Sequence, residues 1–506
     1  MRALLIVAVA FAAGAIGVFN PARSHQPPAN LPDLAAPEAA KPYGVGKAPF
    51  AQRASTSCAG ASCHGGGQVG AVGSEHSTWA RELPPRRDPD DTTPPPPTDP
   101  HARAYSVLFN EVSVRMGKAL GIKEPHKEKR CLACHAVDSA KDAETRDQIL
   151  SEGVGCGGCH GPADKWVSEH TLPSWKARGN REKWEQFGFV PTKSLVARSL
   201  VCAGCHVGDG ARDMNHDMIA AGHPRLAFEP ARFHHQPGYR KHWAEKGSPR
   251  DFEVRLWVVG QAATLRAAAN LLHERATKVA AGDKNSPWPE FSGYSCYACH
   301  QPIGDTETRG SLSASARPPG VPGWEVWSNA TADVAVKSCD LAFPGLSSPE
   351  FTAVKDLRAL MESKRAPAPT EVAKAAKAAV AELDRWLAEV QAAEERTSGA
   401  TDETAPAKIA GRLVANALAE SDPKRLRDHD WDALAANYLG VAAMYHATGG
   451  RAGPAAGWSK PLSAVGTELR FPDGYNGPAK FGRLKLDLIR DNFDALRKTT
   501  GTPEGK

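Results

Sequence analysis

Four copies of the pattern Cys-x-x-Cys-His constrain this chain more than any other feature of its sequence. They begin at Cys131, Cys156, Cys202 and Cys296. Two thiols at this spacing can bond to the two vinyl groups of one porphyrin, and the adjoining histidine can ligate its iron, so the pattern is the attachment signature of c-type haem. Structural zinc sites also use Cys-x-x-Cys pairs, but zinc does not require a histidine directly after each second cysteine. Because only 18 of the 506 residues are histidine, four coincidences are improbable and the sequence predicts haem.

A fifth, looser copy precedes these four and has four residues between its cysteines, Cys58 and Cys63. A small-loop disulfide is the alternative interpretation, but the following His64 and the run Gly65–Gly67 favour haem. The sequence thus predicts five haem c groups. The attachment cysteines are Cys58, Cys63, Cys131, Cys134, Cys156, Cys159, Cys202, Cys205, Cys296 and Cys299, and the adjoining iron ligands are His64, His135, His160, His206 and His300. The eleventh cysteine, Cys339, is expected to be an inert buried thiol.

The formal charge of +5 does not indicate a nucleic-acid partner. Each ferric c-type haem adds a charge of about −1, so the loaded protein is close to neutral. At the N-terminus, Arg2 precedes an apolar run over 3–19, which predicts a secretory signal that is removed or, alternatively, an uncleaved membrane anchor. Either fits an exported protein, periplasmic or anchored facing the periplasm, because bacteria attach haem covalently outside the cytoplasmic membrane. A membrane contact is expected only if this segment is retained.

The composition divides the chain into a signal or anchor (1–24), a flexible leader (25–50), a pentahaem domain (51–305), a linker (306–345) and a helical C-terminal region (346–506). We therefore predict a mainly α fold, in which loop-rich segments wrap closely stacked haems and helices follow.

Within this fold, residues 83–100 predict a proline-rich surface loop that ends in a helix start, with Asp99 as N-cap and Pro100 at the first position. The apolar face of that helix would carry Tyr105, Leu108, Phe109, Val112 and Met116. A long helix is expected over 253–280, with Leu256, Val259, Leu265, Ala269 and Leu272 in the core. Further helices are expected near 351–364, 369–396, 406–419, 430–447 and 478–498.

The second axial ligand of each iron decides whether it only passes electrons or also binds small molecules. The candidates are His101, His170, His216 and His223, with His76 as a weaker one. His101 lies at a helix start, His170 follows His160 by ten residues, and His216 and His223 follow the fourth motif closely. The alternative for each is a surface or hydrogen-bonded histidine.

At these residues the sequence resembles the multihaem cytochromes of the cytochrome c-554 type, which are related to the haem core of hydroxylamine oxidoreductase. The resemblance covers about residues 55–305. It is carried by DPHARAY (99–105), GVGCGGCHGPADKW (153–166), CAGCHVG (202–208), NHDMIAAGHPRL (215–226) and YSCYACHQPI (294–303). It implies helical segments around stacked porphyrins and histidines on both sides of most irons, with His101, His170, His216 and His223 in distal positions. It also implies one high-spin iron with a proximal histidine alone, at the site most similar to that of His135.

The chain departs from the tetrahaem relatives in its fifth motif and in its C-terminal helical region. The Cys-x-x-Cys-Lys motif of pentahaem nitrite reductases is absent from the sequence, which argues against that enzyme. We expect an exported electron carrier rather than a catalyst, with a donor and an acceptor redox protein as partners and nitrogen metabolism as its context. One alternative is an oxidoreductase whose open haem acts on a small nitrogen or sulfur compound. Another is an electron-transfer subunit that its C-terminal helices dock onto a larger respiratory complex.

Overall fold

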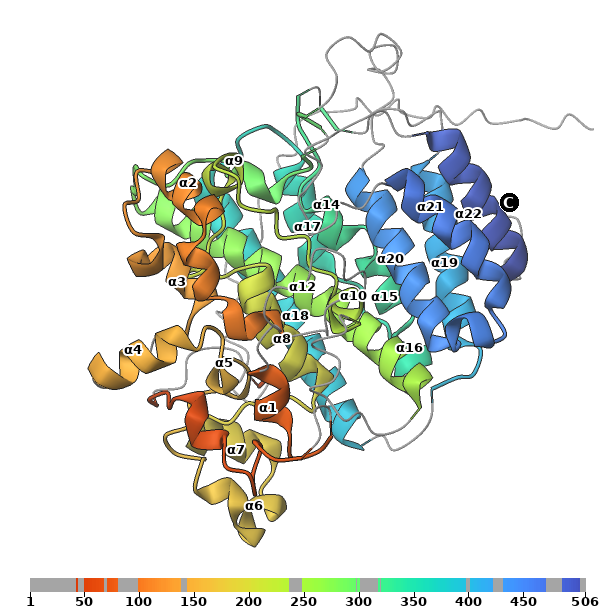
Figure 1. Cartoon of the computed structure of the whole chain (residues 1–506). Coiled ribbons are helices and arrows are strands. Elements are labelled where there is room, and N and C mark those ends of the chain that lie inside the picture. The colour runs from red at the N-terminus through yellow and green to blue at the C-terminus, as the bar shows by residue number, and fades with distance from the viewer. Residues whose placement is uncertain are drawn as a thin grey trace, which may run out of the picture. The chain divides into compact units, whose positions relative to one another are not determined.

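The computed structural model describes residues 42–43, 50–67, 71–80, 99–137, 143–235, 248–296, 298–300, 317–318, 320–396, 401–421, 431–469 and 485–500. These residues form helices joined by loops, with no strand among them, which confirms the predicted mainly α fold (Figure 1). The expected signal segment, nearly all of the leader and the proline-rich stretch 83–98 lie outside the described residues. Within the described ranges, no helix has the length and apolar character that a membrane span requires.

The longest helix, α12 (Pro249–Ala280), forms the centre of the main hydrophobic core. Its start is capped by Ser248, whose hydroxyl accepts a hydrogen bond from the Arg250 amide, with proline at the first helical position. The five residues expected to face the core are all buried, and so are Trp257 and Val258 on other sides of the helix. The helix is therefore enclosed on most sides, as expected for one that is apolar around its circumference. It packs chiefly along α18 (Pro369–Arg396) and α8 (Leu195–His206).

The C-terminal helices belong to the same core as α12. They are α17 (Thr352–Met361), α19 (Ala405–Glu420), α20 (Trp431–Ala447), α21 (Ser459–Leu469) and α22 (Leu486–Thr500). The expected helices over 351–364, 369–396, 406–419 and 430–447 are confirmed within three residues at each end. The last begins later than expected, at Leu486, with 470–484 outside the described residues, and α21 was not anticipated.

Residues 320–345, which the sequence assigned to a linker, are packed into this core. They form α14 (Val326–Asn329), α15 (Ala332–Val336) and α16 (Cys339–Ala342), and the side chains of Trp324 and Phe343 are fully buried beside them. Ser338 is the N-cap residue of α16, and Pro344 and Gly345 follow its end, so these residues separate short helices. Cys339 is buried, as expected.

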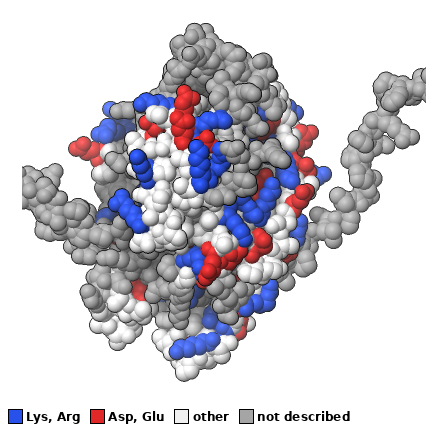
Figure 2. Space-filling view, turned by 90° about the vertical axis from the view of Figure 1, so that its right-hand side faces the viewer, with Lys and Arg blue, Asp and Glu red and all other residues white. Residues whose placement is uncertain are grey.

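Polar contacts tie the C-terminal helices to the preceding region. Arg266 on α12 makes a two-pronged ion pair with Asp384 on α18, at 2.8 and 3.1 Å. Glu394 on α18 accepts hydrogen bonds from Ser194 Oγ at 2.6 Å and from the Leu195 amide at 3.0 Å, at the start of α8. On the side where α21 and α22 lie, Lys and Arg side chains are interspersed with Asp and Glu (Figure 2).

The region before α12 consists of short helices and 3₁₀ turns. They are η2 (Ser55–Cys58), α1 (Glu75–Trp79), η3 (Pro100–Arg103), η4 (Ser106–Phe109), α2 (Glu111–Ala119), η5 (Pro125–Lys127), α3 (Lys129–His135), α4 (Ala143–Ser151), α5 (Cys156–His160), η6 (Glu169–Thr171), α6 (Pro173–Ala177), α7 (Asn180–Phe187), α9 (His216–Ala220) and α10 (Pro230–His234). Its apolar clusters contain only three or four buried residues each. Clusters of this size bury little apolar surface among the described residues, which fits a part of the core that a large apolar group completes.

The single helix expected after Asp99 is divided into η3, η4 and α2. The cap itself is confirmed, because Asp99 Oδ1 accepts a hydrogen bond from the His101 amide at 2.9 Å. The His101 carbonyl then accepts from the Val154 amide at 2.9 Å, and Asn110 caps a new helix by accepting from the Ser113 amide at 2.8 Å. The proposed apolar face is correspondingly divided: Leu108 is buried, whereas Phe109 is 53% exposed.

Candidate functional site

The attachment motifs lie at helix ends, which brings their side chains together. In α3 and α8 the motif forms the last turn, and in α5 it is the whole helix. Residues three apart lie on one face of a helix, so the two cysteines of each motif point the same way and the histidine follows at the helix end. The last motif forms a similar turn, in which the His300 amide donates to the Cys296 carbonyl at 2.8 Å.

The loop between Cys58 and Cys63 is closed by its glycines. The amides of Cys63 and Gly65 both donate to the Gly60 carbonyl, at 2.8 and 3.0 Å. A Cβ atom at Gly65 would lie 1.9 Å from the carbonyl oxygen of Ala59, so only glycine fits there. The two extra residues are thus accommodated in a turn that still presents His64 after the second cysteine.

Four of the five motif histidines have a second histidine ring facing them at nearly the same separation. The ring centres are 6.3 Å apart for His64 and His170, 6.1 Å for His206 and His101, 6.2 Å for His135 and His223, and 6.4 Å for His300 and His216. The ring planes of the first and last pairs are nearly parallel, at 17° and 25°, and those of the other two are nearly perpendicular, at 90° and 86°.

This separation is what one iron between two imidazoles requires. A histidine nitrogen binds a first-row transition metal at about 2.0 Å and lies about 1.1 Å from its ring centre, so two axial rings have centres about 6.2 Å apart. Stacked rings in direct contact can be closer, as Phe109 and His126 are at 4.3 Å. The gap in each pair therefore fits a metal ion with its planar macrocycle.

Hydrogen bonds hold many of these rings in the orientation that a ligand needs. Nδ1 of His135, His170 and His223 lies 2.6–2.7 Å from the carbonyl oxygens of Ala104, Val167 and Pro224. Two rings instead have a carboxylate partner: His64 Nδ1 is 2.9 Å from Glu75, and His101 Nδ1 is 2.8 Å from Asp99. A proton held on Nδ1 leaves the lone pair of Nε2 available for a metal, and such partners fix the ring and tune its basicity.

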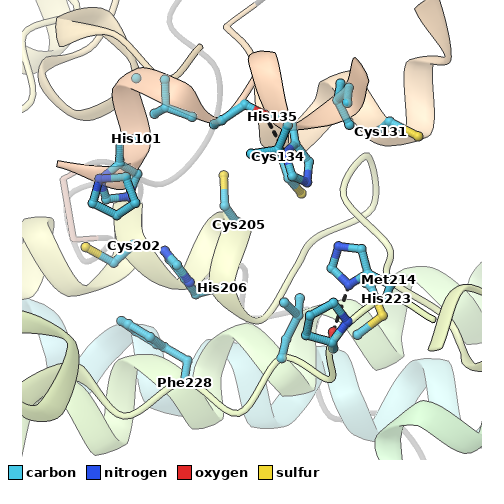
Figure 3. Close-up of a pocket in the computed structure, with 18 of the residues that line it drawn as sticks. His101, Cys131, Cys134, His135, Cys202, Cys205, His206, Met214, His223 and Phe228 are labelled. Carbon is cyan, nitrogen blue, oxygen red and sulfur yellow. Dashed lines mark hydrogen bonds between the residues drawn. The ribbon is translucent and has the colours of Figure 1, made fainter. Parts of the chain in front are cut away.

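Two of the sites open into one cavity of about 910 Å³, mostly lined by apolar side chains. The ring of His101 faces that of His206 across it, and His135 faces His223 (Figure 3). Phe228 stacks on His206 with ring centres 5.0 Å apart. Burial, and then the charge of His101, lowers the pKa of His206 to about 3, so its ring stays neutral and able to ligate a metal.

Cysteines of different motifs are neighbours. The thiols of Cys134 and Cys205 interact, which lowers the pKa of Cys205 and raises that of Cys134. The interaction between the Cys58 and Cys156 thiols likewise raises the pKa of Cys156 and lowers that of Cys58. Burial, followed by the neighbouring Cys202, raises the pKa of Cys159. The groups attached at these motifs would therefore lie side by side.

His76 and His160 differ in their surroundings from the other predicted ligands. The structure does not bring His76 against a motif histidine: its ring contacts Trp79 at 5.6 Å, and the preceding Glu75 is the residue that reaches His64. His160 has its Nδ1 3.4 Å from the Thr192 hydroxyl and its ring 6.1 Å from Phe189.

Comparison with known protein families identifies part of this site. Residues 97–161, which contain His101 and the motifs ending at His135 and His160, match the family model described as cytochrome c554 and c-prime. This part of the chain is similar to cytochromes of the c554 type. Comparison with curated proteins and with solved structures gave no significant match.

The cytochrome assignment and the geometry agree on the group that the site holds. Similarity to this family indicates c-type haem and a role in electron transfer. The cysteine pairs, the facing imidazoles and the apolar cavity fit that group. The hydrogen-bond partners of the histidines were missed by the sequence analysis, apart from Asp99, which it identified only as a helix cap. Backbone carbonyls leave no signal in the sequence, whereas Glu75 could have been noticed eleven residues after His64.

Proposed function

We propose that this cytochrome is an exported pentahaem electron carrier that passes single electrons between a donor and an acceptor protein. The observation that carries the proposal is the set of four histidine pairs at 6.1–6.4 Å, each containing one motif histidine. Bound c-type haem supplies reversible one-electron chemistry. Two imidazoles on an iron leave it no free position for a substrate, which favours electron transfer over catalysis.

The protein's own part is to hold the irons in this ligation state before and after each transfer. The carbonyls of Ala104, Val167 and Pro224 keep three of the rings from turning. The carboxylates of Glu75 and Asp99 favour a more electron-rich imidazole, and hence the ferric state, at two sites. Little reorganisation of the ligands is then needed when an electron arrives.

The neighbouring cysteines support an order for the relay. Each site is named by its motif histidine. Contacts between Cys58 and Cys156, and between Cys134 and Cys205, make the His64 and His160 sites neighbours and the His135 and His206 sites neighbours. The proximity of Cys159 to Cys202 joins these two pairs. His216 and His223 belong to one short segment, so the His300 site would follow the His135 site. The resulting order is His64, His160, His206, His135, His300.

The enzymatic alternative requires an open iron, and the sequence resemblance suggested that this iron is at the His135 site. His223 faces His135 at 6.2 Å, and its Nδ1 is held by the Pro224 carbonyl, so this pair supports two axial ligands there. The docked-subunit alternative rests on the C-terminal helices, whose outer face in Figure 2 has charges of both signs and indicates no particular partner.

Export follows from the requirement for covalent haem attachment outside the cytoplasm together with the basic and apolar N-terminal segment. A role in nitrogen metabolism rests on the sequence resemblance alone. It would be tested by comparing the wild type with a deletion strain for growth on different nitrogen compounds.

The proposal is tested by measuring haem stoichiometry and ligand binding on one sample. We expect the intact mass to equal that of the polypeptide plus five haems, and we expect at least four haems of the reduced protein to keep their spectrum under carbon monoxide, one for each histidine pair. Fewer haems would refute the pentahaem assignment, and the mass of a Cys58→Ser variant would identify whether the first motif is the missing one. A carbon monoxide adduct on more than one haem per molecule would refute the carrier assignment and favour the oxidoreductase.

A further inference from the structure

The surface around α2 has an unusual combination of exposed apolar side chains and positive charge. Of the large hydrophobic residues that are exposed in the described chain, four lie between Val107 and Val114. Val107 and Val112 line the cavity of the His135 and His206 sites and would be covered by bound haem. Phe109 and Val114 do not line it, and each is 53% exposed. These two side chains therefore remain exposed on the outside of the loaded protein.

The chain segment that carries this apolar pair is rich in cationic residues. Between Arg103 and Arg130 the chain has seven Lys and Arg residues and three carboxylates, an excess of four positive charges where the whole chain has +5. The carboxylates Glu111, Glu124 and Glu128 pair with Arg115, Lys127 and Arg130. Lys118, Lys123 and Lys129 are exposed and make no ion pair with any described residue. Their charge is available to a partner.

The same surface is the outer wall of a haem site. Val112 and Met116 on α2 face the cavity, while Val114 lies on the opposite side of that helix. Lys129 and Arg130 directly precede Cys131, the first attachment cysteine of the His135 site. Within the described chain α2 packs mainly on the neighbouring turns η4 and η5, at the edge of the molecule in Figure 1. An electron-transfer protein seated here would be separated from the His135 site by a single layer of side chains.

We propose that this α2 surface, made of Phe109, Val114, Lys118, Lys123 and Lys129, docks an electron-transfer protein with an acidic rim around an apolar contact. Unpaired lysines steer an acidic partner towards the surface, and the apolar pair loses water on contact. The inference rests on the proposed carrier function and adds to it the port through which electrons enter or leave. Anionic membranes are attracted by the same charges, and the test separates the two.

The test uses the holoprotein and a reduced flavodoxin, a small acidic electron carrier, as the probe. The variant is Lys118→Glu/Lys123→Glu/Lys129→Glu, and the matched control is Lys374→Glu/Lys377→Glu/Lys460→Glu, which changes the net charge equally on exposed lysines of the C-terminal helices. Stopped-flow haem absorbance gives the second-order rate constant at several salt concentrations. Equilibrium binding of oxidised flavodoxin, measured by calorimetry, gives a readout that does not depend on electron transfer.

We expect the α2 variant to react at least tenfold more slowly than wild type at low salt, the control to stay within twofold, and the difference to vanish at high salt. Flavodoxin binding should weaken in parallel, and Val114→Ser should weaken it at every salt concentration. Equal losses in both triple variants, or no loss in either, would refute the docking surface. So would unchanged flavodoxin kinetics together with lysine-dependent binding to phosphatidylserine vesicles. Failure of dithionite to reduce the wild-type haems would instead refute the carrier function itself.

Discussion

The angles between paired imidazoles predict two spectroscopic classes of haem iron. Nearly parallel axial rings split the two iron d orbitals with which they interact by π bonding, and give a rhombic paramagnetic resonance signal. Perpendicular rings leave these orbitals close in energy and give a strongly anisotropic signal. The His64–His170 and His216–His300 planes differ by 17° and 25°, and those of His101–His206 and His135–His223 by 90° and 86°. The fully oxidised protein should therefore show at least two irons of each class.

Removal of one distal histidine should change only the class of paramagnetic resonance signal to which its iron belongs. In His223→Ala the ring that faces His135 at 6.2 Å is lost, and the alanine side chain has no atom that can ligate a metal. We expect the strongly anisotropic signals to lose one spin per molecule and a high-spin signal to gain one. His170→Ala is the matched variant, and it should remove one spin from the rhombic signals.

The measurement is spin quantification of spectra from oxidised wild type and both variants, at equal haem content. Carbon monoxide binding to the reduced variants gives an independent count of open irons, with one adduct expected per molecule. A high-spin iron in the wild type that His223→Ala leaves unchanged would contradict the pairing of His135 with His223. If His223→Ala instead removed one spin from the rhombic signals, the assignment of spectroscopic class from the angle between ring planes would be wrong.

Three other substitutions test particular contacts. Glu75→Gln weakens a charge-assisted hydrogen bond to His64, and potentiometric titration should show one midpoint potential raised by about 30–60 mV, whereas Glu111→Gln on the surface should have no effect. Gly65→Ala would place a Cβ atom 1.9 Å from the Ala59 carbonyl oxygen, so the intact mass of this variant should lack one haem. In the control variant Gly179→Ala the new Cβ atom meets open space, and the intact mass should include all the haems of the wild type. Burial raises the pKa of Glu325 to about 7 despite Arg225 and Arg275, so the folded state holds a proton that the unfolded chain releases near pH 4.5. The free energy of unfolding should therefore fall as pH rises from 5 to 7, by up to about 3 kcal/mol in denaturant titrations, and Glu325→Gln should flatten this dependence; an equal slope in both proteins would refute the assignment.

Local sequence signals predicted the helices well where one pattern dominated. The range 369–396 matches α18 at both ends, and the five inward positions expected on α12 are all buried. The stretch after Asp99 was misjudged because apolar spacing was given more weight than Asn110, a capping residue that begins α2. Leu108 and Tyr105 pack in a small apolar cluster, whereas Val112 and Met116 line the cavity and Phe109 is exposed, so the periodicity did not mark one face against the protein core.

The attachment residues could be identified from spacing because each motif is local. The partner of each ring could not, since His135 and His223 are 88 residues apart and His64 and His170 are 106 apart. His76 illustrates the difference. It was a weaker ligand candidate, and α1 turns the side chain of Glu75 rather than that of His76 towards the ring of His64. One residue of helical rotation decides which side chain reaches the ring.

The large helical core has a structural reason to accompany the haem-binding segments. The segment 213–228 supplies both His216 and His223 and contains only one helical turn, α9. It is fixed instead by four contacts with side chains from other parts of the chain. Arg275 on α12 forms an ion pair with Asp213, and Asp432 on α20 forms one with Arg225. Glu290 accepts a hydrogen bond from the His216 amide, and the Trp327 indole on α14 donates one to the Phe228 carbonyl. The elements that supply three of these four contacts are buried in one hydrophobic core, so the positions of two distal rings depend on the packing of helices that have no attachment motif themselves. The additional C-terminal helices therefore support the ligand geometry of a relay, whether or not their outer face binds a partner.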